Sequence, residues 1–361
     1  MIIRTQAYAR IALMGNPSDG YNGKTIASTI TNFRAEVTLW ESPTLKIILN
    51  SVHDPTEFAS LEMLDETASR YGYDDGIPLI RASCKKFNEY CRVHGIELED
   101  KNFTVSYDTN IPRQVGLGGS SAIITAMIKA LMEFYEVTEH FPKSILPNLI
   151  LSVETEELEI NAGLQDRVIQ VYGDTVFMDF SKHLIEEQGH GDYEYLDSSL
   201  IPPLFLTHID EPSHSGKIHS SVKYRYEEGD AEVVQAMQTF AGYASECKTA
   251  LVQQDYDKIS ELMNKNFDLR RKIFGDEVIG AKSLEMIKIA RAQGCPAKFS
   301  GSGGTIIGMY RNWEELRRLA KTYREHGFNF AQVAIEGQKS KIESLDLPQM
   351  SSNGSLFREM R

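Results

Sequence analysis

The feature that most constrains this chain is a glycine-rich stretch that separates a strand-like segment from a helix-like segment. Residues 112–122 have the sequence Pro-Arg-Gln-Val-Gly-Leu-Gly-Gly-Ser-Ser-Ala. Apolar residues alternate over 102–108, which predicts a strand, and the run from 122 to about 135 predicts a helix. Glycines allow positive φ and close backbone approach, and a helix N-terminus favours an anion. The stretch therefore predicts a phosphate-binding turn rather than a tight turn alone.

Two common nucleotide-binding loops do not fit this sequence. A dinucleotide-binding fingerprint needs glycine at the position of Ser121, which also argues against a dehydrogenase. Residues 23–25, Gly-Lys-Thr, nearly match the end of a Walker loop, but Ser18 occupies the place of its first glycine. Pro17 and Asp19 are also poorly suited to a cradle of N–H donors. Both loops are excluded.

Composition limits the class of protein. The chain has 361 residues, 42% of them hydrophobic and 25% charged, which is enough for two globular domains. Its net charge of −13 argues against nucleic acid and anionic membranes as partners. No apolar run reaches the ~18 residues of a membrane span, and the N-terminal residues do not resemble a signal peptide. The four cysteines form no Cys-x-x-Cys pair, so we expect reduced thiols and a cytoplasmic protein.

Periodicity and turn residues predict a mixed α/β organisation in two parts. A polar segment at about 181–200 suggests a boundary, giving domains at 1–190 and 191–340 and a polar tail at 341–361. In the second domain, two strand–helix units on one sheet would form a ferredoxin-like layer. Strands are predicted at 9–14, 33–40, 45–49, 102–108, 175–180, 204–207, 305–310 and 330–334, and helices at 79–90, 122–135, 143–159, 232–253, 256–273, 281–293 and 313–326.

Three further segments carry residues suited to phosphate chemistry, although each also has a purely structural interpretation. Residues 15–19, Gly-Asn-Pro-Ser-Asp, would be either a turn or a set of ligand contacts at a strand end. Glu154 would be either a metal ligand or part of a solvated acidic helix face that includes Glu157. Asp166 would be either a base or a helix N-cap. Residues 298–305, Lys-Phe-Ser-Gly-Ser-Gly-Gly-Thr, form another glycine-rich turn.

The stretch at 112–122 resembles the second motif of the GHMP kinases, the family of galactokinase, homoserine kinase, mevalonate kinase and phosphomevalonate kinase. The family's other two motifs follow in the expected order. Arg10, Gly15 and Asp19 keep the spacing of the galactokinase-like first motif, and residues 298–305 resemble the third motif. Asn16 departs from the glutamate of that first motif, which suggests a sugar other than galactose.

The resemblance implies an α+β, two-domain GHMP kinase fold, with an N-terminal ribosomal-protein-like α/β domain that contains a left-handed βαβ unit and a C-terminal ferredoxin-like domain. It implies ATP and Mg²⁺ as cofactors, with Ser121 and Glu154 as metal ligands. Asp166 would act as base or electrostatic orienter, with Arg10 beside the reacting groups. The residues implied to contact ATP are Pro112, Gly116, Leu117, Gly118, Gly119, Ser120, Ser121 and Ala122, and those implied to contact the acceptor are Asp19, Arg113, Ser302 and Gly303.

Within the family, five stretches are similar to the members that phosphorylate D-glucuronate at its anomeric oxygen. These stretches are 15–19, 107–114, 162–168, 215–217 and 266–272, and the likeness extends over about residues 8–336. A uronate acceptor needs a cation or several donors for its carboxylate, and its product would feed UDP-glucuronate synthesis. Candidates for this cation are Arg10, Arg113, Lys217, Arg270 and Arg271.

Two alternative functions remain open from the sequence. One is a GHMP-type kinase of a neutral hexose or heptose, and the other is a catalytically inactive nucleotide-binding protein. In either kinase reading the partner is a small sugar, with no nucleic acid and no membrane, and the expected state is a monomer or a weak homodimer.

Overall fold

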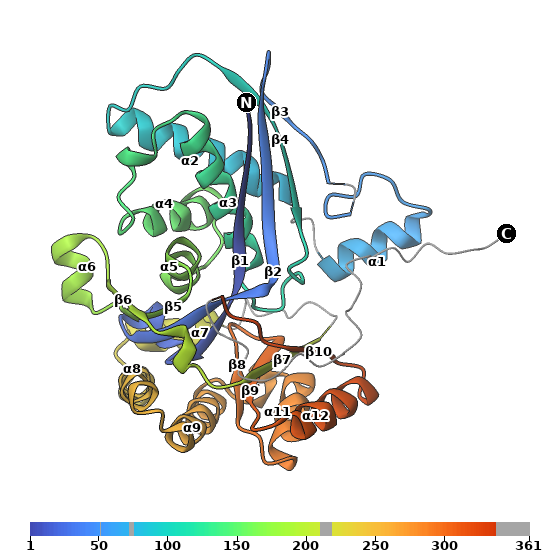
Figure 1. Cartoon of the computed structure of the whole chain (residues 1–361), viewed down its shortest axis with the longest axis vertical. Coiled ribbons are helices and arrows are strands. Elements are labelled where there is room, and N and C mark those ends of the chain that lie inside the picture. Colours follow the sequence, from blue (N-terminus) through green and yellow to red (C-terminus); the bar gives the residue numbers. More distant parts are fainter. Residues whose placement is uncertain (51, 72–75, 210–218, 337–361) are drawn as a thin grey trace.

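Two β-sheets with helices packed against them make up the computed structural model, which describes residues 1–50, 52–71, 76–209 and 219–336 (Figure 1). The first sheet has six strands in the order β3-β4-β2-β5-β6, and β1 pairs with β2 beside this path. The second has four strands in the order β10-β7-β9-β8. The strands of the first sheet are β1 (Ile2–Met14), β2 (Lys24–Ser42), β3 (Lys46–Ile47), β4 (Asn102–Thr109), β5 (Thr175–Asp179) and β6 (Asp192–Leu196).

A long antiparallel hairpin of β1 and β2 forms the centre of the first sheet, because β2 also pairs with β4 and β5. Its register runs from Ile2 opposite Trp40 to Met14 opposite Ile26, with shifts after Tyr8 and near the turn. Both strands begin well before the predicted 9–14 and 33–40, because polar residues such as Thr5 are extended by cross-strand pairing that local apolar periodicity does not report. The hairpin turn carries the polar residues 15–19 to one end of the sheet.

Helices α3 and α5 pack against the first sheet, and α2 and α4 pack against α3 (Figure 1). Helix α3 begins at Gly119, earlier than the predicted 122, because Gly118 adopts a left-handed conformation and acts as its N-cap. The predicted helix at 143–159 is interrupted, since α4 ends at Ser152 and continues as a π-helical turn at Val153–Glu157. The bounds are α1 (Leu61–Tyr71), α2 (Gly76–Val93), α3 (Gly119–Phe134), α4 (Leu146–Ser152), α5 (Leu164–Tyr172) and α6 (Lys182–Gln188).

The chain passes from the first sheet to the second between β6 and β7 (Leu204–His208). Strand β6, within the polar segment 181–200, pairs with β5 and so extends the first sheet as far as Leu196. Neither β6 nor α6 was predicted, because both are largely polar. Strand β7 pairs with β9 and β10 in the second sheet. The predicted tail at 341–361 lies outside the described residues.

The second part closely follows its predicted elements. Asp230, Asp255 and Asn312 accept backbone N–H bonds at the starts of α8, α9 and α12, which fixes where these helices begin. Helices α1, α7 and α10 and the short strand β8 were not predicted from the sequence. The elements are β8 (Ala297–Phe299), β9 (Thr305–Met309), β10 (Asn329–Gln332), α7 (His219–Glu227), α8 (Ala231–Gln253), α9 (Tyr256–Phe274), α10 (Asp276–Ile279), α11 (Ala281–Ala292) and α12 (Trp313–Glu325).

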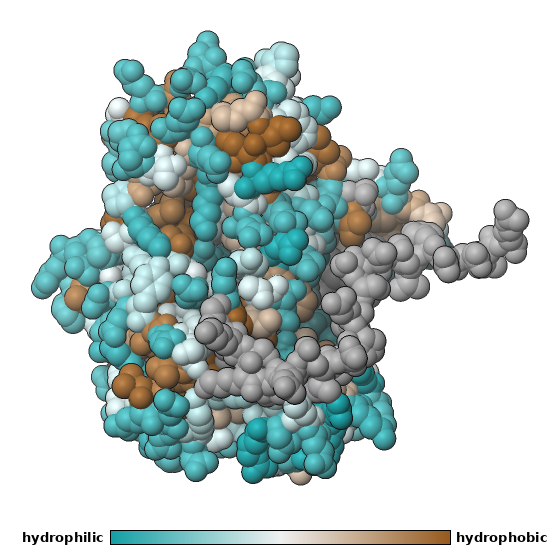
Figure 2. Space-filling view, viewed as in Figure 1, coloured by the Kyte–Doolittle hydropathy of each residue, from teal (hydrophilic) through white to brown (hydrophobic). Residues whose placement is uncertain are grey.

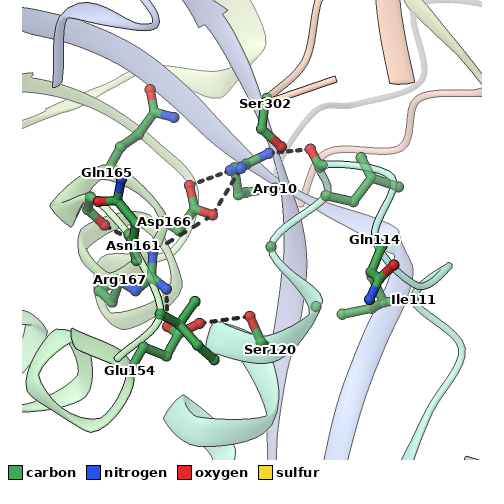
Figure 3. Close-up of a pocket in the computed structure, with 18 of the residues that line it drawn as sticks. Arg10, Ile111, Gln114, Ser120, Glu154, Asn161, Gln165, Asp166, Arg167 and Ser302 are labelled. Carbon is green, nitrogen blue, oxygen red and sulfur yellow. Dashed lines mark hydrogen bonds and ion pairs between the residues drawn. The ribbon is translucent and has the colours of Figure 1, made fainter. Parts of the chain in front are cut away.

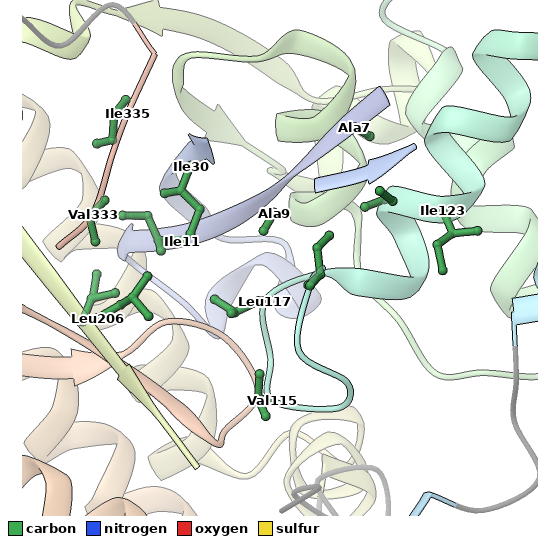
Figure 4. Packing of buried hydrophobic residues seen from close by; sticks show 14 of the residues in the cluster. Ala7, Ala9, Ile11, Ile30, Val115, Leu117, Ile123, Leu206, Val333 and Ile335 are labelled. Atoms are coloured by element: carbon green, nitrogen blue, oxygen red, sulfur yellow. The ribbon is translucent and has the colours of Figure 1, made fainter. Parts of the chain in front are cut away.

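One hydrophobic cluster joins the two sheets and the glycine-rich turn. Ile11 of the first sheet and Leu206 of the second belong to it and are fully buried (Figure 4). Val115 and Leu117, which alternate with the glycines of the turn, point into the same cluster. The turn is therefore anchored by apolar side chains on both sides of Gly116, and its glycines are held at the junction of the sheets.

The surface and the thiols agree with the composition. Hydrophilic residues cover most of the face in Figure 2, and hydrophobic residues there form small groups. None of the helices in the described part of the chain has the length and apolar content needed to cross a bilayer. Cys84 is half-buried, Cys91, Cys247 and Cys295 are buried, and all four are free thiols.

Candidate active site

A cavity of about 670 Å³ lies where the end of the β1–β2 hairpin, the glycine-rich turn, the start of α5 and the turn after β8 meet. Its size suits a ligand larger than a simple sugar. It brings together Arg10 and Asp19 of the first motif, residues 116–120 of the second, and Gly301 and Ser302 of the third. The three motifs, which are far apart in the sequence, therefore form one site.

The glycine-rich turn and the N-terminus of α3 line this cavity. Gly116 and Gly118 have φ values of 76° and 75°, a region in which side chains are strained. Gly118 caps α3 without a side-chain hydrogen bond, and the N–H groups of the first turn of a helix have no acceptor within the helix. A Cβ on Gly116 would lie 2.6 Å from the carbonyl oxygen of Gly303. This geometry suits an anion cradle that the third motif covers closely.

The two serines at the start of α3 point in different directions. Ser120 is exposed, and its Oγ donates a hydrogen bond to Oε1 of Glu154 at 2.8 Å (Figure 3). Ser121 is buried, and its Oγ donates to the carbonyl oxygen of Gly118 at 3.1 Å. The structure thus brings Glu154 together with Ser120 rather than with Ser121, because successive residues of a helix face about 100° apart.

A bidentate ion pair joins the first motif to α5. Nε and Nη2 of Arg10 donate to the two carboxylate oxygens of Asp166 at 2.6 and 2.8 Å (Figure 3). Nη1 of Arg10 also donates to the carbonyl oxygen of Gly116 at 2.7 Å. Asp166 lies in the first turn of α5, where the helix dipole favours a carboxylate. The paired guanidinium therefore fixes the orientation of the carboxylate through two hydrogen bonds.

Glu154 is held by a second arginine. Nη2 of Arg167 donates to Oε2 of Glu154, and Nη1 donates to the carbonyl oxygen of Gly163 at 2.9 Å. Both side chains are buried, and burial together with the charge of Arg10 lowers the pKa of Arg167 to about 9. Glu157, the alternative considered from the sequence, instead pairs with Lys85 away from the cavity.

Asp19 lines the cavity, and its carboxylate approaches the residue that precedes α5. A Cβ on Gly163 would lie 2.9 Å from Oδ2 of Asp19. Burial, and then the negative charge of Asp166, raise the pKa of Asp19 to about 7. A carboxyl group that is partly protonated near neutral pH can both donate and accept hydrogen bonds, which suits a polyhydroxylated ligand.

Buried polar groups of the second part hold the first motif in place. Nζ of Lys298 donates to the carbonyl oxygens of Ala12 and Phe299 and to Oδ1 of Asn16. Nδ2 of Asn266 donates to the carbonyl oxygen of Asn16 at 3.0 Å, and its Oδ1 accepts from the N–H of Gly15 at 2.9 Å. Sequence reasoning assigned no role to Lys298 or Asn266, although a lysine beside a glycine-rich turn was a signal for the first of them.

The remaining predicted residues divide into lining and supporting positions. Pro112, Arg113 and Ser302 line the cavity, whereas Gly303 packs behind Gly116 and Ala122 is buried. Arg271 lies on an exposed face and pairs with Asp276, and Lys217 lies outside the described residues. Lining residues that the sequence did not suggest include His53, Leu79 and Lys223.

The donors present fit a magnesium ion bound partly by phosphate. In the described residues, no three His, Cys, Asp or Glu side chains are grouped as a metal cluster. Mg²⁺ in phosphoryl-transfer sites needs only one or two protein oxygens in addition to substrate phosphates and water. The hydroxyl of Ser120 and the carboxylate of Glu154 are adjacent oxygen donors beside the glycine-rich turn, and they meet this requirement.

Comparison with known protein families agrees with this architecture. Residues 79–174 match the model described as GHMP kinases N terminal domain, and residues 247–329 match GHMP kinases C terminal. With a near full-length relative of 45% identity in addition, the chain belongs to the GHMP kinase family. The family-level prediction and the two-domain α+β fold are confirmed.

Within this family, the chain is similar to two plant proteins over almost its whole length. The chain is 45% identical to a protein of Arabidopsis thaliana named Probable glucuronokinase 2, over 97% of this chain and 95% of that protein. It is also 45% identical to Glucuronokinase 1 of the same plant, over 92% of each. A solved structure of the Lin0012 protein from Listeria innocua has a TM-score of 0.73 and covers 92% of this chain and 97% of that one; at 14% identity it shows the shared fold alone.

The raised pKa of Asp19 predicts a pH-dependent effect of Asp19→Asn on stability. An unfolded aspartate loses its proton near pH 3.8, and Asp19 in the folded protein loses it near pH 7. Between these values the folded state binds more protons, so this group makes the wild type less stable as pH rises. We therefore expect Asp19→Asn to raise the thermal midpoint at about pH 8, and to raise it much less at about pH 5. An equal change at both pH values in thermal unfolding would contradict the raised pKa.

Proposed function

We propose that this protein transfers the γ-phosphoryl group of ATP to the anomeric hydroxyl of D-glucuronate, giving D-glucuronate 1-phosphate and ADP. The observation that carries the proposal is the bidentate pair of Arg10 and Asp166 beside an open helix N-terminus in one cavity. Phosphoryl transfer requires a phosphate cradle and a group that positions the acceptor hydroxyl, and both face the same space. The choice of D-glucuronate as the acceptor is supported by the 45% identity to the glucuronokinases of Arabidopsis thaliana.

In this proposal the phosphates of ATP lie on residues 116–120, where the N-terminal turn of α3 lines the cavity. His53, Leu79, Tyr107 and Ile111 line the same cavity and offer a mainly apolar wall for the base. Asp166 accepts the proton of the C1 hydroxyl. The C1 oxygen of the sugar forms a bond to the γ-phosphorus, and the bond between this phosphorus and the ADP oxygen breaks. Arg10 holds this carboxylate in a fixed orientation through two hydrogen bonds.

Mg²⁺ would be bound by Ser120 and Glu154 and would neutralise charge on the phosphates. Ser121 instead supports the turn through its bond to Gly118. On the acceptor side, Asp19, Arg113 and Ser302 line the cavity and are proposed to contact the sugar, with Gly303 supporting the turn behind them. We also propose a cytosolic monomer or weak homodimer that needs no nucleic acid; the four free thiols are consistent with a reducing compartment.

The test of this function is phosphate transfer from Mg-ATP to a panel of free sugars. D-glucuronate, D-galacturonate, glucose, galactose and a heptose are compared side by side, and the products are identified by phosphorus NMR. We expect D-glucuronate 1-phosphate as the main product. A preference for a neutral hexose or heptose would retain the kinase chemistry and discard the uronate acceptor. Absence of transfer to every sugar would favour a nucleotide-binding protein without catalysis.

Asp166→Asn is expected to lower turnover at least about 100-fold, the usual scale for a lost acid–base group. ATP binding should change little, because Asp166 does not belong to the phosphate cradle. Turnover is measured at saturating substrates, and ATP affinity by calorimetry. Asp179→Asn is a matched control, since this carboxylate also pairs with a cation but lies outside the cavity. Turnover of Asp166→Asn close to that of the wild type would remove Asp166 from the mechanism.

Ser120→Ala and Ser121→Ala form a matched pair that tests the metal site. We expect Ser120→Ala to raise the Mg²⁺ concentration needed for half-maximal activity about 10-fold, within the range for loss of a contact that supports a metal. Ser121→Ala should alter this concentration less and should mainly lower thermal stability, because its hydroxyl is buried against Gly118. The reverse order of effects in a Mg²⁺ titration would return Ser121 to the metal site.

A further inference from the structure

The cavity has a local excess of positive charge in a chain whose net charge is −13. Among the described residues that line it, five are arginine or lysine and three are aspartate or glutamate. The cations are Arg10, Arg113, Arg167, Lys223 and Arg270, and the carboxylates are Asp19, Glu154 and Asp166. A cluster of like charges in a cleft is costly unless anionic ligands bind there. The phosphates of a nucleotide account for part of this charge.

Four of the five cations have fixed protein partners. Arg10 is paired with Asp166, and Arg167 with Glu154. Arg113 follows β4 and contacts the carbonyl oxygen of His53 at 3.5 Å. Arg270 is buried and donates to the carbonyl oxygens of Gly301 and Ser302, both at 2.8 Å. These side chains are therefore positioned mainly by the protein itself.

Lys223 differs from the other four because it is exposed. It lies on α7, and its ammonium makes no ion pair with any carboxylate in the described ranges. Lysine ammonium groups at a cavity wall can reach a ligand carboxylate without disrupting an existing pair. Of the cations that line this cavity, Lys223 is the one whose charge is available to a ligand at the least structural cost.

The packing of α7 places Lys223 at the Asp19 end of the cavity. The hydroxyl of Tyr226 on α7 donates to the carbonyl oxygen of Tyr21 at 3.1 Å, and the two rings pack edge to face at 4.9 Å. Val222 is buried in the same small hydrophobic cluster as Tyr21. Tyr21 itself lines the cavity and belongs to the same turn as Asp19, Ser18–Tyr21. The helix is thereby anchored on the segment that would contact the sugar.

We propose that the ammonium of Lys223 binds the carboxylate of the acceptor and so selects a uronic acid over the corresponding neutral sugar. This assignment rests on the proposed function, since it concerns the acceptor of the same reaction. Arg270, fixed between the rings of Phe274 and Phe299, adds positive potential at this end without moving. Its charge also acts on Asp19 and Tyr21, which locates it on the acceptor side.

The test compares binding of two probes that differ only in charge, D-glucuronate and D-glucuronamide. Binding to the full chain is measured by calorimetry with a non-hydrolysable ATP analogue and Mg²⁺ present, for the wild type, Lys223→Gln and Lys223→Arg. Lys272→Gln is the matched control. Lys272 is also exposed and lies on α9 near Arg270, but it pairs with Glu232 outside the cavity. This variant loses the same charge without losing the proposed contact.

We expect Lys223→Gln to weaken D-glucuronate binding about 10-fold and to change D-glucuronamide binding less than about 2-fold, because only the charge-assisted bond is lost. Lys223→Arg should retain most of the affinity for D-glucuronate, and Lys272→Gln should behave as the wild type. Equal weakening for both probes would indicate a structural role and overturn the assignment. Unchanged binding of D-glucuronate, or a wild type that does not prefer it to the amide, would also overturn it.

The same experiment separates this assignment from the proposed reaction. If Lys223→Gln selectively loses D-glucuronate while the wild type forms no sugar phosphate in the panel assay, the carboxylate subsite stands and the kinase reaction is wrong. If D-glucuronate 1-phosphate forms and Lys223→Gln binds both probes as the wild type does, the reaction stands and the subsite is wrong.

Discussion

The guanidinium of Arg10 is the interaction on which the rest of the site depends. It holds both carboxylate oxygens of Asp166 and the carbonyl oxygen of Gly116, and a Cβ on Gly301 would lie 2.8 Å from its Nη1. This buried cation of the first motif is therefore bonded to α5 and to the second motif, and it lies close to the third. Because a guanidinium has five donors in a rigid plane, it can satisfy these acceptors together and fix their relative positions.

The two sheets are joined by polar bonds as well as by the hydrophobic cluster. Lys298 is fully buried and has no carboxylate partner in the described part of the chain, and burial holds the pKa of its amine well below the usual value. It donates to backbone and amide oxygens of the first motif, and Asn266 does the same from α9. Such buried polar groups are costly when unpaired, so they favour one arrangement of the two sheets over others. This arrangement closes the turn after β8 over the glycine-rich turn.

Sequence patterns predicted the helices and strands whose signals, such as apolar spacing and N-cap residues, lie within the segment itself. The capped helices α8, α9 and α12 were found within a few residues, because their apolar spacing and N-cap residues are both present in the sequence. The first half of β1, together with β6 and α7, was missed, because these elements are polar and depend on neighbours distant in the chain. Strand formation at Thr5 or Tyr193 is decided by cross-strand pairing, which a local pattern does not contain.

The sequence by itself determined the three motifs and the family of the chain, and it predicted phosphate binding at residues 112–122. These follow from residue types at fixed spacing, because glycine conformation and helix N-termini are local properties. Only the tertiary structure decided that Ser120 rather than Ser121 is hydrogen-bonded to Glu154, that Arg10 forms an ion pair with Asp166, and that Lys223 lines the cavity. These contacts join residues that are far apart in the sequence. They form only when the chain folds, so the spacing of residues along the sequence does not predict them.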